Sequence, residues 1–466
     1  MVIVFLLAGL AALAALVGLH WYVWRRLVRD TTAGPGLARR AGTVVFVALP
    51  VMMVAALAAE RGGAPFWLQR TLAWPGFLWL ALFMYLVLAL IAGEVVRPLL
   101  RRFLERRGPA RAPVPPLRLR KTETVPAGAP ESPEAAKGAT DTPDTPDTPG
   151  TPDTPDTPGT PGTPGTPGTP GTPGTPGTAA PRAPAVPRLL VAPSRRLFVS
   201  RVVAGSAAAV AAGTVGYGTY GVLRGPRVKR VTVPLAKLPR GAHGFRIAVV
   251  SDIHLGPVLG RGFAQKVVDT INSTQPDLIA VVGDLVDGSV KDLGPAAAPL
   301  AQLRARHGAF FVTGNHEYFS GAEQWVEEVR RLGLRLLENA RVELPAFDLA
   351  GVNDLAGESE GQGPDFTKAL GGRDTSRASV LLAHQPVQIH DAVEHGVDLQ
   401  LSGHTHGGQL WPGNFVADLA NPTLAGLERY GDTQLYVSRG AGAWGPPTRV
   451  GAPSDITVVE LASRQA

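Results

Sequence analysis

Five short apolar segments in the second half of the chain each end in a cluster of polar residues that can bind metal ions. Apolar runs of about four to eight residues that alternate with amphipathic helical patterns are typical of buried strands. Open α/β sheets bind their ligands at the carboxyl ends of their strands, so the five clusters predict one shared site. In chain order the clusters are Ser251-Asp252-Ile253-His254, Gly283-Asp284-Leu285-Val286-Asp287, Gly314-Asn315-His316-Glu317, Ala383-His384-Gln385 and Gly403-His404-Thr405-His406.

The same alternation predicts the fold class, which is α/β with two packed β-sheets flanked by helices. The late run of strands is the reason to expect a second sheet. We expect strands at 245–251, 278–282, 309–313, 334–337, 342–344, 348–352, 379–383, 398–401, 434–438 and 456–461. Helices are expected at 263–274, 323–332 and 389–394, and a further helix should end near 300–306.

The clusters supply carboxylate, amide and imidazole groups as candidate metal ligands. The chain has no cysteine, so thiolate ligands are excluded, and this mixture of nitrogen and oxygen donors suits Mn, Fe or Zn, with Mg also open. So many ligands exceed the needs of one ion and suit two, which a carboxylate such as Asp284 can bridge at about 3.5–4 Å. The candidates are Asp252, His254, Asp284, Asn315, His384, His404 and His406.

Each candidate taken singly has an ordinary structural explanation. Asp252 could cap a helix, Asn315 could be a turn residue and His384 could be a packed histidine. The interpretation as ligands depends on the five clusters occurring together, each at a strand end.

This series of clusters resembles the calcineurin-like metallophosphoesterase superfamily. The pattern of that family is Asp-x-His, Gly-Asp-x-x-Asp, Gly-Asn-His-Glu, a lone His and Gly-His-x-His, and all five occur in order between residues 251 and 406. The stretch from Gly403 to Gln409, with Tyr436-Val437-Ser438-Arg439-Gly440, is similar to the bacterial membrane-associated branch with an extracytoplasmic phosphoesterase domain. The resemblance covers roughly residues 227–462. The fold it implies is a pair of mixed sheets flanked by helices.

The resemblance also implies a role for each matching residue. One ion would be held by Asp252, His254, Asp284 and His406, and a second by Asp284, Asn315, His384 and His404. His316 would face the substrate phosphate and protonate or stabilise the leaving oxygen, and Asp287 and Glu317 would orient the ligands and His316. The implied reaction is hydrolysis of a phosphodiester or pyrophosphate by a metal-bound hydroxide.

Three apolar runs near the N-terminus are long enough to cross a membrane. They lie at 1–24, 41–59 and 74–92, and arginines flank each of them. About 20 apolar residues cross a hydrocarbon core of roughly 30 Å. The distribution of arginine predicts that 25–40 and the segment after 97 face the cytoplasm, with the N-terminus and 60–70 outside. Buried helices of a soluble domain are the alternative.

Two further segments separate these runs from the catalytic half. Residues 108–193 contain Asp-Thr-Pro and Gly-Thr-Pro repeats, and because Asp takes the glycine position five times we expect a disordered spacer rather than collagen. Residues 194–224 begin with Ser194-Arg195-Arg196-Leu197-Phe198-Val199, which resembles a twin-arginine export signal. This segment is predicted to be a signal anchor or a fourth membrane helix, and its cleavage stays open. The predicted regions are therefore 1–107, 108–193, 194–224 and 225–466.

The charge distribution bears on the partners of the protein. The formal net charge is +7, and the basic excess lies before residue 227, beside the apolar runs. It therefore indicates membrane orientation and not nucleic-acid binding, and no obligate protein partner is evident.

The sequence thus predicts a multi-pass cell-membrane phosphoesterase with an extracytoplasmic catalytic domain. Its substrate could be a lipid or cell-envelope phosphate ester, because Leu410, Trp411 and Phe415 follow the last cluster. Trp411 could instead be a lid that does not touch substrate. A different class of function is also open, in which the protein is a membrane-tethered sensor or interaction protein and the phosphoesterase domain is an auxiliary module.

Overall fold

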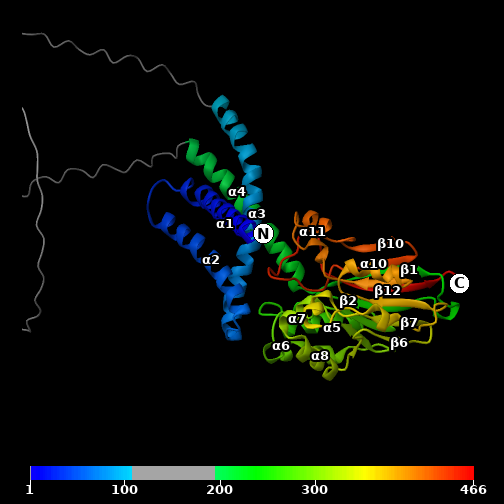
Figure 1. Ribbon diagram of the computed structural model, residues 1–466. Helices are drawn as coiled ribbons and strands as arrows, with labels where there is room; N and C mark the ends of the chain where they lie inside the picture. Colours follow the sequence, from blue (N-terminus) through cyan, green and yellow to red (C-terminus); the bar gives the residue numbers. More distant parts are fainter. Residues whose placement is uncertain (1, 108–194, 466) are drawn as a thin grey trace, which may run out of the picture. The chain divides into compact units, whose positions relative to one another are not determined.

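Four long apolar helices precede the catalytic half in the computed structural model (Figure 1), which describes residues 2–107 and 195–465. They are α1 (Val2–Trp24), α2 (Leu37–Arg61), α3 (Phe66–Arg107) and α4 (Arg195–Leu223). By length and composition all four could cross a membrane. The described parts of the three predicted runs are therefore helical, as are residues 195–223 of the fourth segment, while the predicted spacer at 108–193 lies outside the described residues.

Helix α3 is much longer than the predicted run at 74–92. It includes the polar stretch after Glu94, and Pro75 and Pro98 lie within it. Its polar part is fixed by ion pairs, because Arg26 lies 2.8 Å from Glu94 in the segment that follows α1. Tyr22 donates a hydrogen bond to the same carboxylate at 2.9 Å. One end of the helix group is thus marked by paired charges, while its middle is apolar.

The first sheet contains the strands that carry three of the five clusters. Its order is β1-β12-β2-β3-β4-β5, and β2, β3 and β4 run parallel as neighbours. The strands are β1 (Arg227–Leu235), β2 (Phe245–Val250), β3 (Leu278–Val282), β4 (Ala309–Val312), β5 (Arg335–Leu336) and β12 (Asp455–Ser463). Strand β12 pairs antiparallel with β2, so the sheet is mixed.

The second sheet carries the other two clusters. Its order is β10-β11-β9-β8-β7-β6, with β8 and β9 parallel and β6 and β10 antiparallel to their neighbours. The strands are β6 (Ala340–Glu343), β7 (Phe347–Gly351), β8 (Ala378–Leu382), β9 (Leu399–Ser402), β10 (Gly426–Tyr430) and β11 (Thr433–Val437). The prediction of two mixed, packed sheets is confirmed.

Alternate residues of each strand face different apolar cores. On β2, Ile247 and Val249 join the core between the two sheets, and Ala248 and Val250 join the core under the outer helices. This period of two follows from the strand pleat, and because both faces are covered the strands are apolar throughout. The result is a four-layer arrangement in which helices cover both outer faces (Figure 1).

Short helices cover these outer faces and fill the connections. The first sheet packs against α5 (Arg261–Ser273), α6 (Val290–Ala297) and α8 (Ala322–Arg331), and the second against α9 (Phe366–Leu370) and α10 (Ile389–Glu394). Helix α7 (Asn315–Ser320) begins inside the third cluster. Helix α11 (Asn414–Ala420) follows the last cluster and has no buried residue. The predicted helix end near 300–306 falls at the short helix Ala298–Gln302.

Trp325 of α8 provides a test of the core between α8 and the first sheet. Its side chain is fully buried, and its indole nitrogen donates to the Gly288 carbonyl at 2.9 Å. Replacing Trp325 by Ala should lower the free energy of unfolding by about 3–5 kcal/mol, because a large cavity opens and an acceptor loses its donor. Thermal unfolding of the detergent-solubilised chain measures this. The exposed Trp67→Ala change is the control, and equal midpoints for both variants would contradict the packing.

Candidate metal centre

All five polar clusters meet where the parallel strands of the two sheets end. Asp252, Asp284 and Asn315 follow β2, β3 and β4, while His384 and His404 follow β8 and β9. Parallel neighbours present their carboxyl ends at the same edge, and packing of the two sheets brings the two edges together. The predicted strand-end positions of the clusters are therefore found in the structure.

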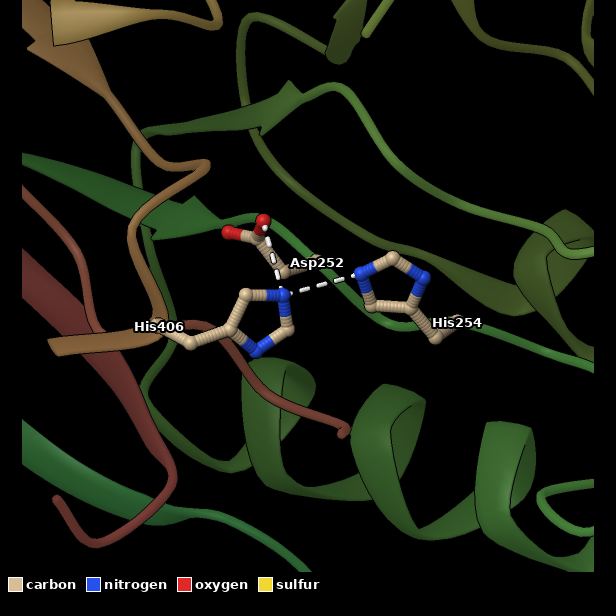
Figure 2. A group of neighbouring side chains, drawn as sticks. All are labelled: Asp252, His254 and His406. Carbon is tan, nitrogen blue, oxygen red and sulfur yellow. Dashed lines mark hydrogen bonds and ion pairs between the residues drawn. The ribbon is translucent and has the colours of Figure 1, made fainter. Parts of the chain in front are cut away.

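Asp252, His254 and His406 form the first group of candidate ligands (Figure 2). The Nε2 atoms of His254 and His406 are 3.0 Å apart, and Nε2 of His406 is 3.5 Å from Oδ1 of Asp252. Two imidazole nitrogens and a carboxylate oxygen thus converge on one point, and all three side chains are buried. This donor set suits a borderline divalent ion.

Asp284, His384 and His404 form the second group. Nε2 of His384 lies 3.2 Å from Oδ2 of Asp284, and Nδ1 of His404 lies 3.0 Å from Oδ1 of Asn315. Nδ1 of His384 is held by the Val282 carbonyl at 2.9 Å, which turns its buried Nε2 toward the carboxylate of Asp284. A metal-binding histidine holds its second ring nitrogen in this way, so these residues fit the ion that the resemblance implies.

Asp284 lies between the two groups. Its Oδ2 is 3.2 Å from His384 of the second group and 3.8 Å from Nε2 of His254 in the first. The other oxygen, Oδ1, accepts the backbone N–H of His316 at 2.9 Å, which fixes the carboxylate plane. A carboxylate in this place can serve both groups.

The ligand-bearing loops have an unusual backbone. Positive φ angles occur at Asp252 (51°), His254 (48°), Asp284 (54°), His404 (71°) and His406 (53°). Non-glycine residues seldom adopt this conformation, and strain of this kind collects at functional sites. Gly314 is required for close approach, since a Cβ there would overlap the carboxylate of Asp284. The chain therefore gives up local backbone preference to bring these side chains together.

Asp287 connects the first group to His316. Its Oδ1 lies 2.8 Å from Nδ1 of His254 and 2.7 Å from Nδ1 of His316. Burial works against the charged imidazole, but the hydrogen bond and charge of Asp287 prevail and raise the pKa of His316 to about 9. Burial likewise opposes ionisation of Asp287, but the charge and hydrogen bond of His254, with those of His316, lower its pKa to about 2. His316 is therefore held as a cation at neutral pH.

Glu317 fixes the backbone of two loops. Its fully buried carboxylate accepts hydrogen bonds from the N–H groups of Asp284 (2.9 Å), Leu285 (2.7 Å) and Gly314 (2.6 Å). Burial, together with the charge of Asp284, raises the pKa of Glu317 to about 7. The residue thus ties the loop after β3 to the start of α7.

Arg449 is a buried residue beside the site that sequence reasoning missed. Its Nη2 lies 2.9 Å from Nδ1 of His406, and its other nitrogens donate to carbonyls including that of Gly442 at 2.6 Å. Burial and the arginine charge lower the pKa of His406 well below its ordinary value. Metal ligation requires neutral imidazole, so this environment favours the binding form. Nothing in the local sequence marked this arginine.

Two exposed aromatic residues flank His316. The ring of Phe319 lies 5.5 Å and that of Trp444 5.8 Å from the His316 ring. Gln409 fixes the backbone of Trp444, because its side chain accepts a hydrogen bond from the backbone N–H of Trp444 at 3.1 Å and donates one to the Trp444 carbonyl at 2.9 Å. Sequence reasoning missed both aromatics. Trp444 follows β11, which is parallel to β9, so the same strand-end rule would have found it.

Comparison with known proteins agrees with this geometry. The sequence matches the calcineurin-like phosphoesterase family over residues 245–408. An uncharacterized metallophosphoesterase of Aquifex aeolicus is 37% identical over 240 residues, which cover 50% of this chain and 91% of that protein. One from Bacillus subtilis is 30% identical over 285 residues, covering 58% and 98%. A zebrafish (Danio rerio) transmembrane protein with metallophosphoesterase domain is 40% identical over 259 residues, covering 53% and 59%.

The chain belongs to the calcineurin-like phosphoesterase family. The predicted resemblance to this superfamily is thereby confirmed, and the chain holds the groups of candidate metal ligands that a metal-dependent phosphoesterase needs. Four helices among the described residues are long and apolar enough to cross a membrane. The chain spans only 59% to 66% of the length of the first curated relatives that it matches.

The Asp287–His316 pair can be tested in metal-free protein. The pKa of His316 is raised above its unfolded value of about 6.5, so the pair stabilises the fold fully below that pH, and this contribution is lost as pH rises through about 9. Asp287→Asn should bring the His316 pKa down, because burial alone lowers it. NMR titration of histidine-labelled, metal-free protein measures this, with Asp374→Asn as a distant control. An unchanged His316 titration in Asp287→Asn would contradict the pairing.

Proposed function

We propose that the chain is a membrane-anchored binuclear phosphoesterase that hydrolyses a phosphodiester or pyrophosphate. The observation that carries this proposal is the position of Asp284 between two separate groups of imidazole and carboxylate donors. A site for a single ion would not need a second complete set of ligands. In this proposal Asp252, His254 and His406 hold one ion, Asn315, His384 and His404 hold the other, and Asp284 serves both.

His316 is the residue that handles the leaving group. When bound, the two ions supply a hydroxide nucleophile near neutral pH and neutralise phosphoryl charge. The imidazolium of His316, held by Asp287, can donate its Nε2 proton to the departing oxygen, which would otherwise leave as a costly alkoxide. Asp287 then retains the imidazole in the orientation in which Nδ1 faces the carboxylate. Glu317 keeps the loops of Asp284 and Asn315 in register throughout.

The surroundings of His316 indicate the kind of leaving group. Phe319 and Trp444 both lie beside the imidazole, and both side chains are largely exposed. Aromatic faces bind apolar or planar groups and contribute little to binding of a bare phosphate. These contacts support a substrate with an apolar or aromatic alcohol, which includes a lipid-linked phosphate ester.

The helix contacts support an extracytoplasmic catalytic domain. Arg26 pairs with Glu94, and Arg201 donates to the Thr31 carbonyl at 3.0 Å, so the arginine-rich ends of the helices lie together. At the opposite ends of α3 and α4, Phe66 and Leu223 pack against the core of the phosphoesterase domain. Arginine-rich ends face the cytoplasm in most membrane proteins, which favours the catalytic domain on the other side.

Metal stoichiometry tests the binuclear proposal. The purified, chelator-treated chain should take up two Mn ions, and Asp284→Asn should weaken both by at least about tenfold, because both groups lose a shared ligand. His406→Ala should weaken only one ion and His384→Ala only the other. Isothermal titration with elemental analysis measures the uptake. Loss of a single ion in Asp284→Asn, with parental affinity for the second, would contradict the shared position.

Activity with graded leaving groups tests the role of His316. His316→Asn should lower kcat about 10²–10⁴-fold on a phenyl phosphodiester, because proton donation to the leaving oxygen is lost. The loss should be smaller on a p-nitrophenyl ester, whose leaving group needs no proton. The control is His390→Asn, an exposed histidine on α10. Equal losses on both esters would remove the acid role while leaving the hydrolase proposal intact.

A further inference from the structure

Helix α11 presents an apolar face that no part of the described structure covers. Its residues Phe415, Val416 and Leu419 are 62%, 71% and 90% exposed. At 3.6 residues per turn these three side chains share one face, and Asp418 lies roughly 100° from its centre. A short helix with one apolar and one polar side is typical of a segment that lies in a membrane interface.

The loop that leads into α11 is attached to the membrane helices. Tyr85 of α3 donates a hydrogen bond to the Trp411 carbonyl at 2.8 Å. Leu410 and Val450 pack against the apolar cluster of α1, α3 and α4 that contains Trp79 and Phe83. The side chains that surround the start of α11 are therefore those of the candidate spans.

The depth of this attachment follows from helix geometry. The ion pair of Glu94 with Arg26 marks the polar end of the helix group. At about 1.5 Å per residue, Tyr85 lies roughly 14 Å along α3 from Glu94. On α4, Val203 contacts Gly93, the residue before Glu94. Gly218 contacts Arg449 and lies roughly 22 Å farther along α4 than Val203. Both lengths are shorter than a hydrocarbon core of roughly 30 Å, so this edge of the domain lies at bilayer depth.

We propose that the segment 411–419 inserts into the bilayer beside α3, with Phe415, Val416 and Leu419 in contact with lipid acyl chains. The occupant of the exposed face is thus the bilayer that carries α1 to α4. A second copy of the chain or a soluble protein partner could also cover this face. In either case the face would be exposed to water in a monomer that is alone in a membrane. The attachment of the preceding loop to the helix group is what favours lipid.

Helix α11 adjoins the loop from Gly403 to Gln409, which carries the candidate ligands His404 and His406. A Cβ on Gly408, whose φ is +77°, would overlap the backbone of Asn414 at the start of α11. Gln409 joins the same loop to Trp444, which stands beside His316. The loop before α11 is therefore linked through Gln409 and Trp444 to the proposed acid. As a consequence that rests on the proposed function, the substrate is a phosphate ester of a lipid that reaches His316 from the bilayer.

Site-directed spin labelling tests the insertion without reference to activity. The chain has no cysteine, so Leu419→Cys gives a single labelled site in the full chain reconstituted in nanodiscs. The water-exposed control is Asp432→Cys in the β10–β11 turn, and the lipid-facing control is Leu10→Cys on α1. The label at 419 should collide with oxygen and be shielded from a water-soluble nickel chelate, as at 10. Accessibility equal to that at 432, in monomeric protein, would overturn the proposal.

A kinetic comparison separates the insertion from the reaction. Phe415→Ser with Leu419→Ser should lower kcat/KM about tenfold or more on a long-chain lipid phosphodiester in the bilayer, since apolar burial is lost. Hydrolysis of a soluble aryl phosphodiester should change less than about twofold. The control pair is Val387→Ser with Val393→Ser, which are exposed elsewhere on the domain. If the label at 419 lies in lipid but the double variant loses activity equally on both esters, the lipid-substrate consequence is wrong. If the parent protein hydrolyses neither ester, the proposed function alone is wrong.

Discussion

The arrangement of this domain depends on burying several charges at one edge without leaving any of them unpaired. The carboxylate of Asp284 is almost completely buried, and it faces His384 and His254. Burial disfavours the charged carboxylate, but the imidazoles prevail and hold the pKa of Asp284 below its ordinary range. A buried charge without such partners would cost several kcal/mol. The positive φ angles and the glycines of the loops are conditions for this pairing, because each brings a ligand within range of its partners.

The sequence was sufficient to predict the sheets wherever strands are buried on both faces. Strands such as β3 and β8 are continuous apolar runs, and their carboxyl ends could be placed to within about a residue. Of the four edge strands, β5 and β6 were predicted, whereas β1 and β10 were missed. The first half of β1 is mostly exposed and carries Arg227, Lys229 and Arg230, and most of β10 is exposed as well. Edge strands tolerate charge, so they lack the apolar signal by which inner strands are recognised.

The candidate site also contains residues that the sequence could predict and residues that it could not. Residues that follow strand ends could be predicted, since the ends of parallel strands meet whatever the loops do. The role of Asp287 in orienting the ligands and His316 came from the family resemblance, because no spacing rule supplies its distances of 2.8 Å or less to the rings of His254 and His316. Arg449 could not be predicted, because it reaches His406 from a loop far along the chain. Such contacts are products of tertiary packing and leave no local pattern in the sequence.

The composition of α4 acquires a packing explanation. The segment resembles an export signal at its start, yet its small residues are where other segments approach. Ala204, Ala207 and Ala211 are buried, and a Cβ on Gly218 would overlap the backbone carbonyl of Arg449. Small residues allow close backbone approach between membrane helices, and here they also admit the loop that carries Arg449 to His406. A more apolar helix with larger side chains would hold the domain away from the helix group, and Tyr85 would then fail to reach Trp411. The small residues of α4 and the contact between Tyr85 and Trp411 are therefore two consequences of one requirement for close packing.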